Sequence, residues 1–197
     1  RSATTVGQMP ALGTKLRVPA PRRALVARSR LANPFTGAVG EWPRLVLIAA
    51  GAGFGKTTLL TQWLAGVPHH RVAWVALDDG DADVQQFLAG LVASLARSAP
   101  DVGREATALL DGERDALVGD VVASLVNDLD QLPGATVIAL DDYHRAGTGS
   151  VHEAVQFLLE NLPPRVSVVL TTRVDRFPWR ECALVVSCTR CGQRNFD

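Results

Sequence analysis

Four short runs of apolar residues recur along the chain, at residues 44–50, 72–77, 136–140 and 166–171. Each run is continuous rather than alternating between apolar and polar positions. Continuous apolar runs of this length are typical of strands that are buried on both faces of a sheet. The pattern therefore predicts four β-strands within one buried sheet.

Between these runs, apolar residues recur at the three- and four-residue spacing of amphipathic helices. The pattern predicts helices over residues 56–65, 83–96, 115–132 and 151–161, with residues 100–114 irregular or weakly helical. Asp83 is expected to be the N-cap of the second helix. Strand and helix thus alternate four times, which implies an α/β fold with a parallel sheet and helices on both faces. In such sheets, ligands bind at the carboxyl ends of the strands.

The two ends of the chain depart from this alternation. Residues 1–24 are polar and proline-rich and predict an extended N-terminal arm, whereas residues 25–176 form the predicted α/β domain. Residues 177–197 are interpreted as a divergent tail, disordered or frame-shifted, although residues 183–187 could pair as a fifth strand. Because the chain opens on Arg1 and its only methionine is Met9, we interpret it as a fragment or as starting at Met9.

Composition narrows the class of protein. Of the 197 residues, 47% are hydrophobic and 20% are charged, which allows a core and argues against a disordered chain. The 20 basic and 20 acidic residues balance to a net charge of zero, which argues against a dedicated nucleic-acid binder. No run approaches the roughly 18 apolar residues of a membrane span, and no signal peptide is evident. We therefore expect a cytoplasmic protein without a membrane partner.

The strongest chemical signal follows the first predicted strand. Residues 50–57 read AGAGFGKT and match the pattern G-x-x-x-x-G-K-[ST], with Ala50 in place of the first glycine. In this pattern, backbone N–H groups surround the β-phosphate of a nucleotide, and the positive end of the following helix points at it. We expect Lys56 to bridge the β- and γ-phosphates and the Thr57 hydroxyl to ligate Mg²⁺. The predicted nucleotide-binding residues are Ala50, Gly51, Ala52, Gly53, Phe54, Gly55, Lys56, Thr57 and Thr58.

The alternative interpretation of this loop is a glycine-rich turn between strand and helix that binds nothing. Two observations favour nucleotide binding. The motif lies between a buried strand and an amphipathic helix, which is the context in which such a loop binds phosphate. Lys56 is also one of only two lysines among the 20 basic residues, which makes its position informative.

Two carboxylates end the third predicted strand. Residues 137–142 read VIALDD, the pattern of a Walker B strand, and they follow the loop at a distance of about 85 residues. We expect Asp141 to hold Mg²⁺ through its water shell, and Asp142 to orient or deprotonate the attacking water. The alternative is a pair of turn-forming aspartates at a strand end.

Arg173 follows the fourth predicted strand, in the segment VVLTTR. A strand inserted beside the loop-bearing strand would bring its carboxyl end to the γ-phosphate, where a basic group can sense that phosphate. The alternative is an exposed arginine on a loop. We take Lys56, Asp142 and Arg173 as the candidate catalytic residues. His144 could touch the same phosphate site or serve a surface or capping role.

In this order, the motifs resemble the ATP-binding module of STAND-class P-loop NTPases, which have an ASCE or AAA-like sheet. More specifically, residues 12–175 resemble the amino-terminal part of MalT-like, large ATP-binding LuxR-type transcriptional regulators. The matching segments include GAGFGKTTLLTQWLA, VAWVALDDGDAD, ALDDYH and TTRVD, and residues 13–31 are similar to the arm that begins those proteins.

The resemblance implies a switch driven by ATP and ADP, in which hydrolysis is slow and the ATP-bound state favours self-association. It also implies that the nucleotide lies between the arm and the loop, with Val26 and Arg28 near the adenine. DNA would be contacted only through a C-terminal helix-turn-helix, and an inducer would bind in a separate region. Neither of these regions fits within the 197 residues.

Two other functions stay open at this point. One is a generic P-loop ATPase or kinase with a separate small substrate. The other is a non-catalytic remnant that binds nucleotide without turnover.

The chain departs from the family's pattern after residue 175, where a helical lid is expected.

Overall fold

Five parallel strands form one sheet in the computed structural model, which describes residues 13–20, 31–36, 42–66, 70–112, 117–147, 149–173 and 183–187. The strands are β1 (Leu45–Ala49), β2 (His70–Ala76), β3 (Ala135–Asp141), β4 (Val166–Thr172) and β5 (Leu184–Ser187). The four strands predicted from the apolar runs are therefore confirmed. The additional strand suggested at residues 183–187 is also present, and it pairs in parallel with β1.

The strand order is β2-β3-β4-β1-β5, so β4 lies between β1 and β3 although it follows both along the chain. In this register, Val168 of β4 pairs with Leu45 on one side and with Ile138 on the other. Because all of these pairs are parallel, the carboxyl ends of β1, β4 and β3 meet at one edge of the sheet. This carboxyl edge receives the loop after β1, the acidic end of β3 and the segment after β4.

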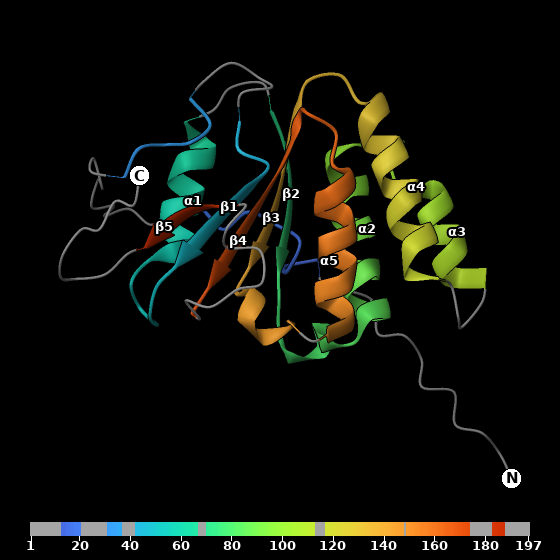
Figure 1. Cartoon of the computed structure of the whole chain (residues 1–197), viewed down its shortest axis with the longest axis horizontal. Coiled ribbons are helices and arrows are strands. Elements are labelled where there is room, and N and C mark those ends of the chain that lie inside the picture. Colours follow the sequence, from blue (N-terminus) through green and yellow to red (C-terminus); the bar gives the residue numbers. More distant parts are fainter. Residues whose placement is uncertain are drawn as a thin grey trace, which may run out of the picture.

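Helices cover both faces of the sheet, as predicted (Figure 1). They are α1 (Lys56–Ala65), α2 (Val84–Ser98), α3 (Arg104–Gly112), α4 (Val118–Gln131) and α5 (Gly149–Asn161). Helix α1 lies on one side of the sheet, whereas α2, α4 and α5 lie on the other side, with α3 packed against α2 and α4. None of the helices in the described ranges is both long enough and apolar enough to span a membrane.

Each face of the sheet contributes to its own apolar cluster. Neighbouring strand residues point to opposite faces, so Leu47 packs in the cluster with α2 and α5, whereas Ile48 packs in the cluster with α1. With helices on both sides, β1, β3 and β4 bury every one of their residues. Burial on both faces is the reason that these strands are continuous apolar runs in the sequence.

The predicted helix boundaries agree with the structure to within a few residues, and Asp83 caps α2 by accepting a hydrogen bond from the Gln86 N–H at 2.9 Å. The segment at residues 100–114, expected to be irregular or weakly helical, contains a regular helix, α3, at residues 104–112. Only Ala106 of this short helix is fully buried, and only Leu109 and Leu110 are large apolar residues, so the local signals for it in the sequence are few. Its packing against α2 and α4 stabilises it instead.

The described part of the arm is bound to the end of β2, an edge strand. The Ala76 N–H donates to the Lys15 carbonyl at 2.8 Å. The Lys15 ammonium lies 2.6 Å from Asp81 Oδ2 and 3.0 Å from Asp78 Oδ2, in the turn after β2. The Asp81 side chain is only 3% exposed, and its other donor is the Asp78 N–H at 2.8 Å. Lys15 therefore neutralises a buried carboxylate and joins the arm to the sheet.

We predict that Lys15→Met lowers the free energy of unfolding by about 1–3 kcal/mol, because the buried Asp81 carboxylate loses its cation. The hydrogen bond from Lys15 also lowers the pKa of Asp78. The stability that this ion pair contributes is therefore fully present above the ordinary aspartate pKa, and it is lost as the pH falls through the lowered pKa of Asp78. The difference in the free energy of unfolding between wild type and Lys15→Met should therefore become smaller in acid. Urea denaturation at a series of pH values from about 7 to about 3 measures this difference.

Arg145→Gln is the matched control for this prediction. The pair of Arg145 with Asp79, at 3.1 Å, joins two side chains that are both well exposed. Its loss should leave the free energy of unfolding unchanged within experimental error. Equal destabilisation by the two substitutions would contradict the importance of burial at Asp81.

Candidate nucleotide-binding site

A glycine-rich loop, residues 50–55, joins β1 to α1 at the carboxyl edge. Gly53 and Gly55 have φ values of 79° and 75°, in the left-handed region that residues with a side chain rarely adopt. Helix α1 then begins at Lys56, with Gly55 as its N-cap and no side-chain cap. The first N–H groups of the helix and the positive end of its dipole therefore face this loop, an arrangement suited to phosphate.

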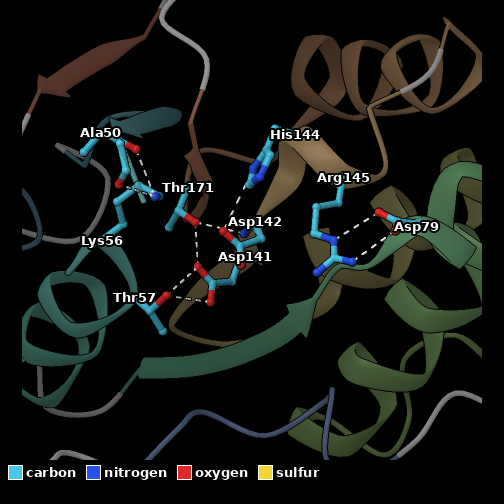
Figure 2. A network of polar contacts seen from close by, with 10 residues as sticks. Ala50, Lys56, Thr57, Asp79, Asp141, Asp142, His144, Arg145 and Thr171 are labelled. Carbon is cyan, nitrogen blue, oxygen red and sulfur yellow. Dashed lines mark hydrogen bonds and ion pairs between the residues drawn. The ribbon is translucent and has the colours of Figure 1, made fainter. Parts of the chain in front are cut away.

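The Lys56 side chain folds back over the loop (Figure 2). Its Nζ donates to the carbonyl oxygens of Ala50 at 3.0 Å and Gly51 at 3.2 Å, and the residue is buried. The loop is also tied to β4, because the Ala50 N–H donates to the Thr172 carbonyl at 3.1 Å. A positive charge is therefore held at the loop by neutral carbonyl groups, which an anionic ligand could replace.

Thr57 and Asp141 meet across the carboxyl edge, from the first turn of α1 and the end of β3 (Figure 2). The Thr57 hydroxyl lies 3.0 Å and 2.9 Å from the two carboxylate oxygens of Asp141. Burial raises the pKa of Asp141, while hydrogen bonds from Thr171 and Thr57 act in the opposite direction. Hydroxyl and carboxylate oxygens are the hard donors that Mg²⁺ prefers, so this pair fits the predicted cation.

Thr171, in β4, belongs to the site although the sequence analysis did not single it out. Its hydroxyl donates to Asp141 Oδ1 at 2.5 Å and accepts the Asp142 N–H at 2.9 Å, and the residue is fully buried. Figure 2 shows Thr171 between Lys56 and the two aspartates. The only signal in the sequence was its position in the TTR segment, two residues before Arg173.

Asp142 adopts a left-handed backbone conformation, with φ 56° and ψ 40°. It is the one non-glycine residue with a positive φ in the part of the chain that the structure describes. Residues with a side chain adopt this conformation unfavourably, and such strained residues cluster at functional sites. The short 3-10 helix η2 (Tyr143–Arg145) begins directly after it. The backbone strain thus falls on a residue that the sequence analysis selected as a candidate catalytic group.

His144 is mostly buried, rather than a surface residue. Its side chain is 15% exposed, and its Nδ1 lies 3.9 Å from Asp142 Oδ1. Burial is the main cause of its lowered pKa; the Asp142 carboxylate opposes this shift, and the positive charges of Arg173 and Lys56 add to it. Arg173 is exposed directly after β4. The Asp142 carboxylate, a candidate catalytic group, therefore lies beside the His144 imidazole.

The remaining predicted residues lie on the loop, in α1 or outside the described ranges. Phe54 packs its ring against Gly51, where an added Cβ would lie 3.3 Å from two ring carbons. Ala52 is exposed on the loop, and Thr58 lies in the first turn of α1. Val26 and Arg28, which we expect near the adenine, fall outside the described residues.

Comparisons with known proteins relate the chain to segments of two larger kinds of protein. It is 30% identical to the serine/threonine-protein kinase PknK of Mycobacterium tuberculosis over 190 residues. This alignment covers 95% of this chain and 16% of that protein. It is 31% identical over 160 residues to the HTH-type transcriptional regulator MalT of Klebsiella pneumoniae, covering 81% of this chain and 17% of that protein. The chain thus spans about one sixth of the length of these relatives. No family model matches it.

Solved structures share the fold at low sequence identity. A chain of Drosophila ORC bound to DNA aligns with a TM-score of 0.53 and 18% identity, over 80% of this chain and 41% of that one. A chain in the structure of Drosophila ORC bound to AT-rich DNA and Cdc6 aligns with a TM-score of 0.51 and 12% identity, over 77% of this chain and 50% of that one. The chain therefore has the predicted AAA-like P-loop NTPase fold and is homologous to a segment of MalT-like regulators.

Proposed function

We propose that this chain is the Mg²⁺-dependent, ATP- and ADP-binding module of a LuxR-type transcriptional regulator, and that it works as a slow ATPase switch. The observation that carries the proposal is the contact of the Thr57 hydroxyl with both carboxylate oxygens of Asp141, at 3.0 Å and 2.9 Å. This contact joins a glycine-rich loop and helix start to the acidic end of β3. A turn that bound nothing would require neither this carboxylate nor a buried lysine that folds back over the loop.

The roles of the binding residues follow from their positions. The N–H groups of the loop and the dipole of α1 would bind the phosphates, and Lys56 would exchange its two carbonyl partners for phosphate oxygens. Thr57 and Asp141 would hold Mg²⁺, which supplies positive charge at the phosphates when it is bound. Val26 and Arg28 are proposed to lie on the adenine side.

Hydrolysis would use Asp142 and Arg173. The Asp142 side chain is 35% exposed at the carboxyl edge, so its carboxylate can reach a water molecule and orient or deprotonate it. Arg173 follows β4, the strand between β1 and β3, where it can respond to the terminal phosphate. Slow hydrolysis suits a switch, because the ATP-bound state must persist in order to act.

The regulatory part of the proposal is supported by the homology to a segment of MalT, which is named as an HTH-type transcriptional regulator. We propose that ATP favours self-association of the full-length regulator in the cytoplasm, and that DNA is bound through a C-terminal helix-turn-helix. The balance of 20 basic and 20 acidic residues supports a module that contacts nucleotide rather than DNA.

Kinetics distinguish this switch from the other two functions that the sequence left open. Phosphate transfer that requires an added small acceptor would favour a kinase. Retention of ADP through purification would favour the switch. Nucleotide binding with no release of phosphate would favour a non-catalytic remnant.

Lys56→Ala is expected to weaken the binding of ATP and ADP by about 100-fold or more, because charge-assisted hydrogen bonds to phosphate are lost. Asp142→Asn is expected to leave nucleotide affinity within about threefold of wild type, and to slow phosphate release by about 100-fold. Isothermal titration calorimetry measures the affinities, and a phosphate-release assay measures the rates.

The two variants are controls for each other, because each removes one charge from the same edge of the sheet. Circular dichroism establishes that both are folded. Unaltered affinity in folded Lys56→Ala protein would refute the proposal, as would the absence of heat when folded wild-type protein meets Mg-ATP and Mg-ADP.

The left-handed conformation of Asp142 generates a separate prediction about stability. Asp142→Gly and Asp142→Ala both remove the carboxylate, but only alanine keeps a Cβ in this conformation. The free energy of unfolding of Asp142→Gly should therefore exceed that of Asp142→Ala by about 1 kcal/mol. Urea denaturation compares the two, and equal stabilities would contradict a strained backbone at this position.

A further inference from the structure

Thr171 has a fully buried side-chain hydroxyl, and it lies where β4 and β3 run side by side toward the candidate functional residues. It comes from β4, and it contacts Asp141 and Asp142 at the end of β3. A hydroxyl has a single proton. That proton is donated to Asp141 Oδ1, at 2.5 Å, while a lone pair accepts the Asp142 N–H, at 2.9 Å. The hydroxyl is therefore committed to both aspartates at once.

We propose that Thr171 is a positioning residue, which orients the Asp141 carboxylate for Mg²⁺ and holds Asp142 in its left-handed conformation. This inference rests on the proposed function, since it assigns Asp141 to the cation. It concerns a residue that is buried beneath the carboxyl edge. Thr171 would act through the two aspartates rather than on the nucleotide.

The contacts of the Asp141 carboxylate support the first part of this role. The Thr57 hydroxyl lies almost equally far from both oxygens, 3.0 Å from Oδ1 and 2.9 Å from Oδ2, so it does not distinguish between them. The bond from Thr171 goes to Oδ1 alone and is the shorter one. It ties Oδ1 to β4, so both threonine hydroxyls contact Oδ1, whereas Oδ2 is contacted by that of Thr57, at the start of α1. Thr171 thus fixes which oxygen is presented toward the loop.

The backbone of Asp142 supports the second part. This residue has a φ of 56°, which residues with a side chain adopt unfavourably. Its N–H donates to the Thr171 hydroxyl, and this bond holds the peptide in place at the end of β3. One hydroxyl therefore links the residue that would hold the cation to the residue that would orient water. Arg173 follows two residues later, directly after the end of β4.

A buried threonine can also be a structural residue that merely satisfies its neighbours. The two roles differ in how nucleotide binding responds to Mg²⁺. A structural role would lower stability and leave the gain in ADP affinity on adding Mg²⁺ unchanged. A positioning role toward Asp141 would reduce that gain, because residues that orient metal ligands typically change metal affinity by about 10- to 100-fold.

The experiment measures ADP affinity by calorimetry, with Mg²⁺ and with excess EDTA, in wild type and three variants. Thr171→Val keeps the shape but removes the hydroxyl, and Thr171→Ser keeps the hydroxyl. Thr136→Val is the matched control, because Thr136 is equally buried but lies near the amino end of β3. We expect Thr171→Val to reduce the Mg²⁺-dependent gain by about tenfold or more, and the other two to keep it within about threefold of wild type.

An undiminished gain in Thr171→Val, or a loss of the gain in Thr136→Val of the same size, would overturn the inference and leave the proposed function intact. Absence of ADP binding by wild type under both conditions would instead refute the proposed function, and this inference with it. Should Thr171→Val fail to fold, Thr171→Ala replaces it, with the same expected loss and the same contrary result.

Discussion

One buried carboxylate, that of Asp141, ties three elements of this molecule together. Asp141 is the last residue of β3, and its carboxylate accepts hydrogen bonds from Thr57 at the start of α1 and from Thr171 in β4. A carboxylate that is almost completely buried requires such donors, because burial disfavours its charged form and raises its pKa. The start of the helix and the ends of two strands are therefore joined by a single group.

Pairs of opposite charge extend this arrangement to the neighbouring strand. Lys15 is paired with two aspartates in the turn after β2, and Asp79 in the same turn is paired with Arg145 after β3. The turn after β2 therefore contacts both the described arm and the segment that follows Asp142. Interacting polar groups thus line the carboxyl edge from the end of β2 past the ends of β3 and β4. This is the edge at which α/β sheets bind ligands.

Much of the fold was predictable from local pattern, because burial on both faces imposes continuous apolar runs on the strands. The four runs correspond to β1 to β4, and Asp83 caps α2 as its place before an amphipathic stretch indicates. Helix α3 was less predictable, since it is short and has only two large apolar residues, Leu109 and Leu110. The strand at residues 183–187 could only be suggested, because its pairing with β1 joins segments that are far apart in sequence.

The sequence by itself determined the local chemistry of the site: glycines where φ is positive, Lys56 and Thr57 at the start of a helix, and paired aspartates at the end of a strand. Only the tertiary structure decided which groups meet. Thr171 lies 30 residues from Asp141 and Thr57 lies 84 residues from it, and they converge because β4 is inserted between β1 and β3. A run of apolar residues encodes that a strand is buried, but not which strands become its neighbours.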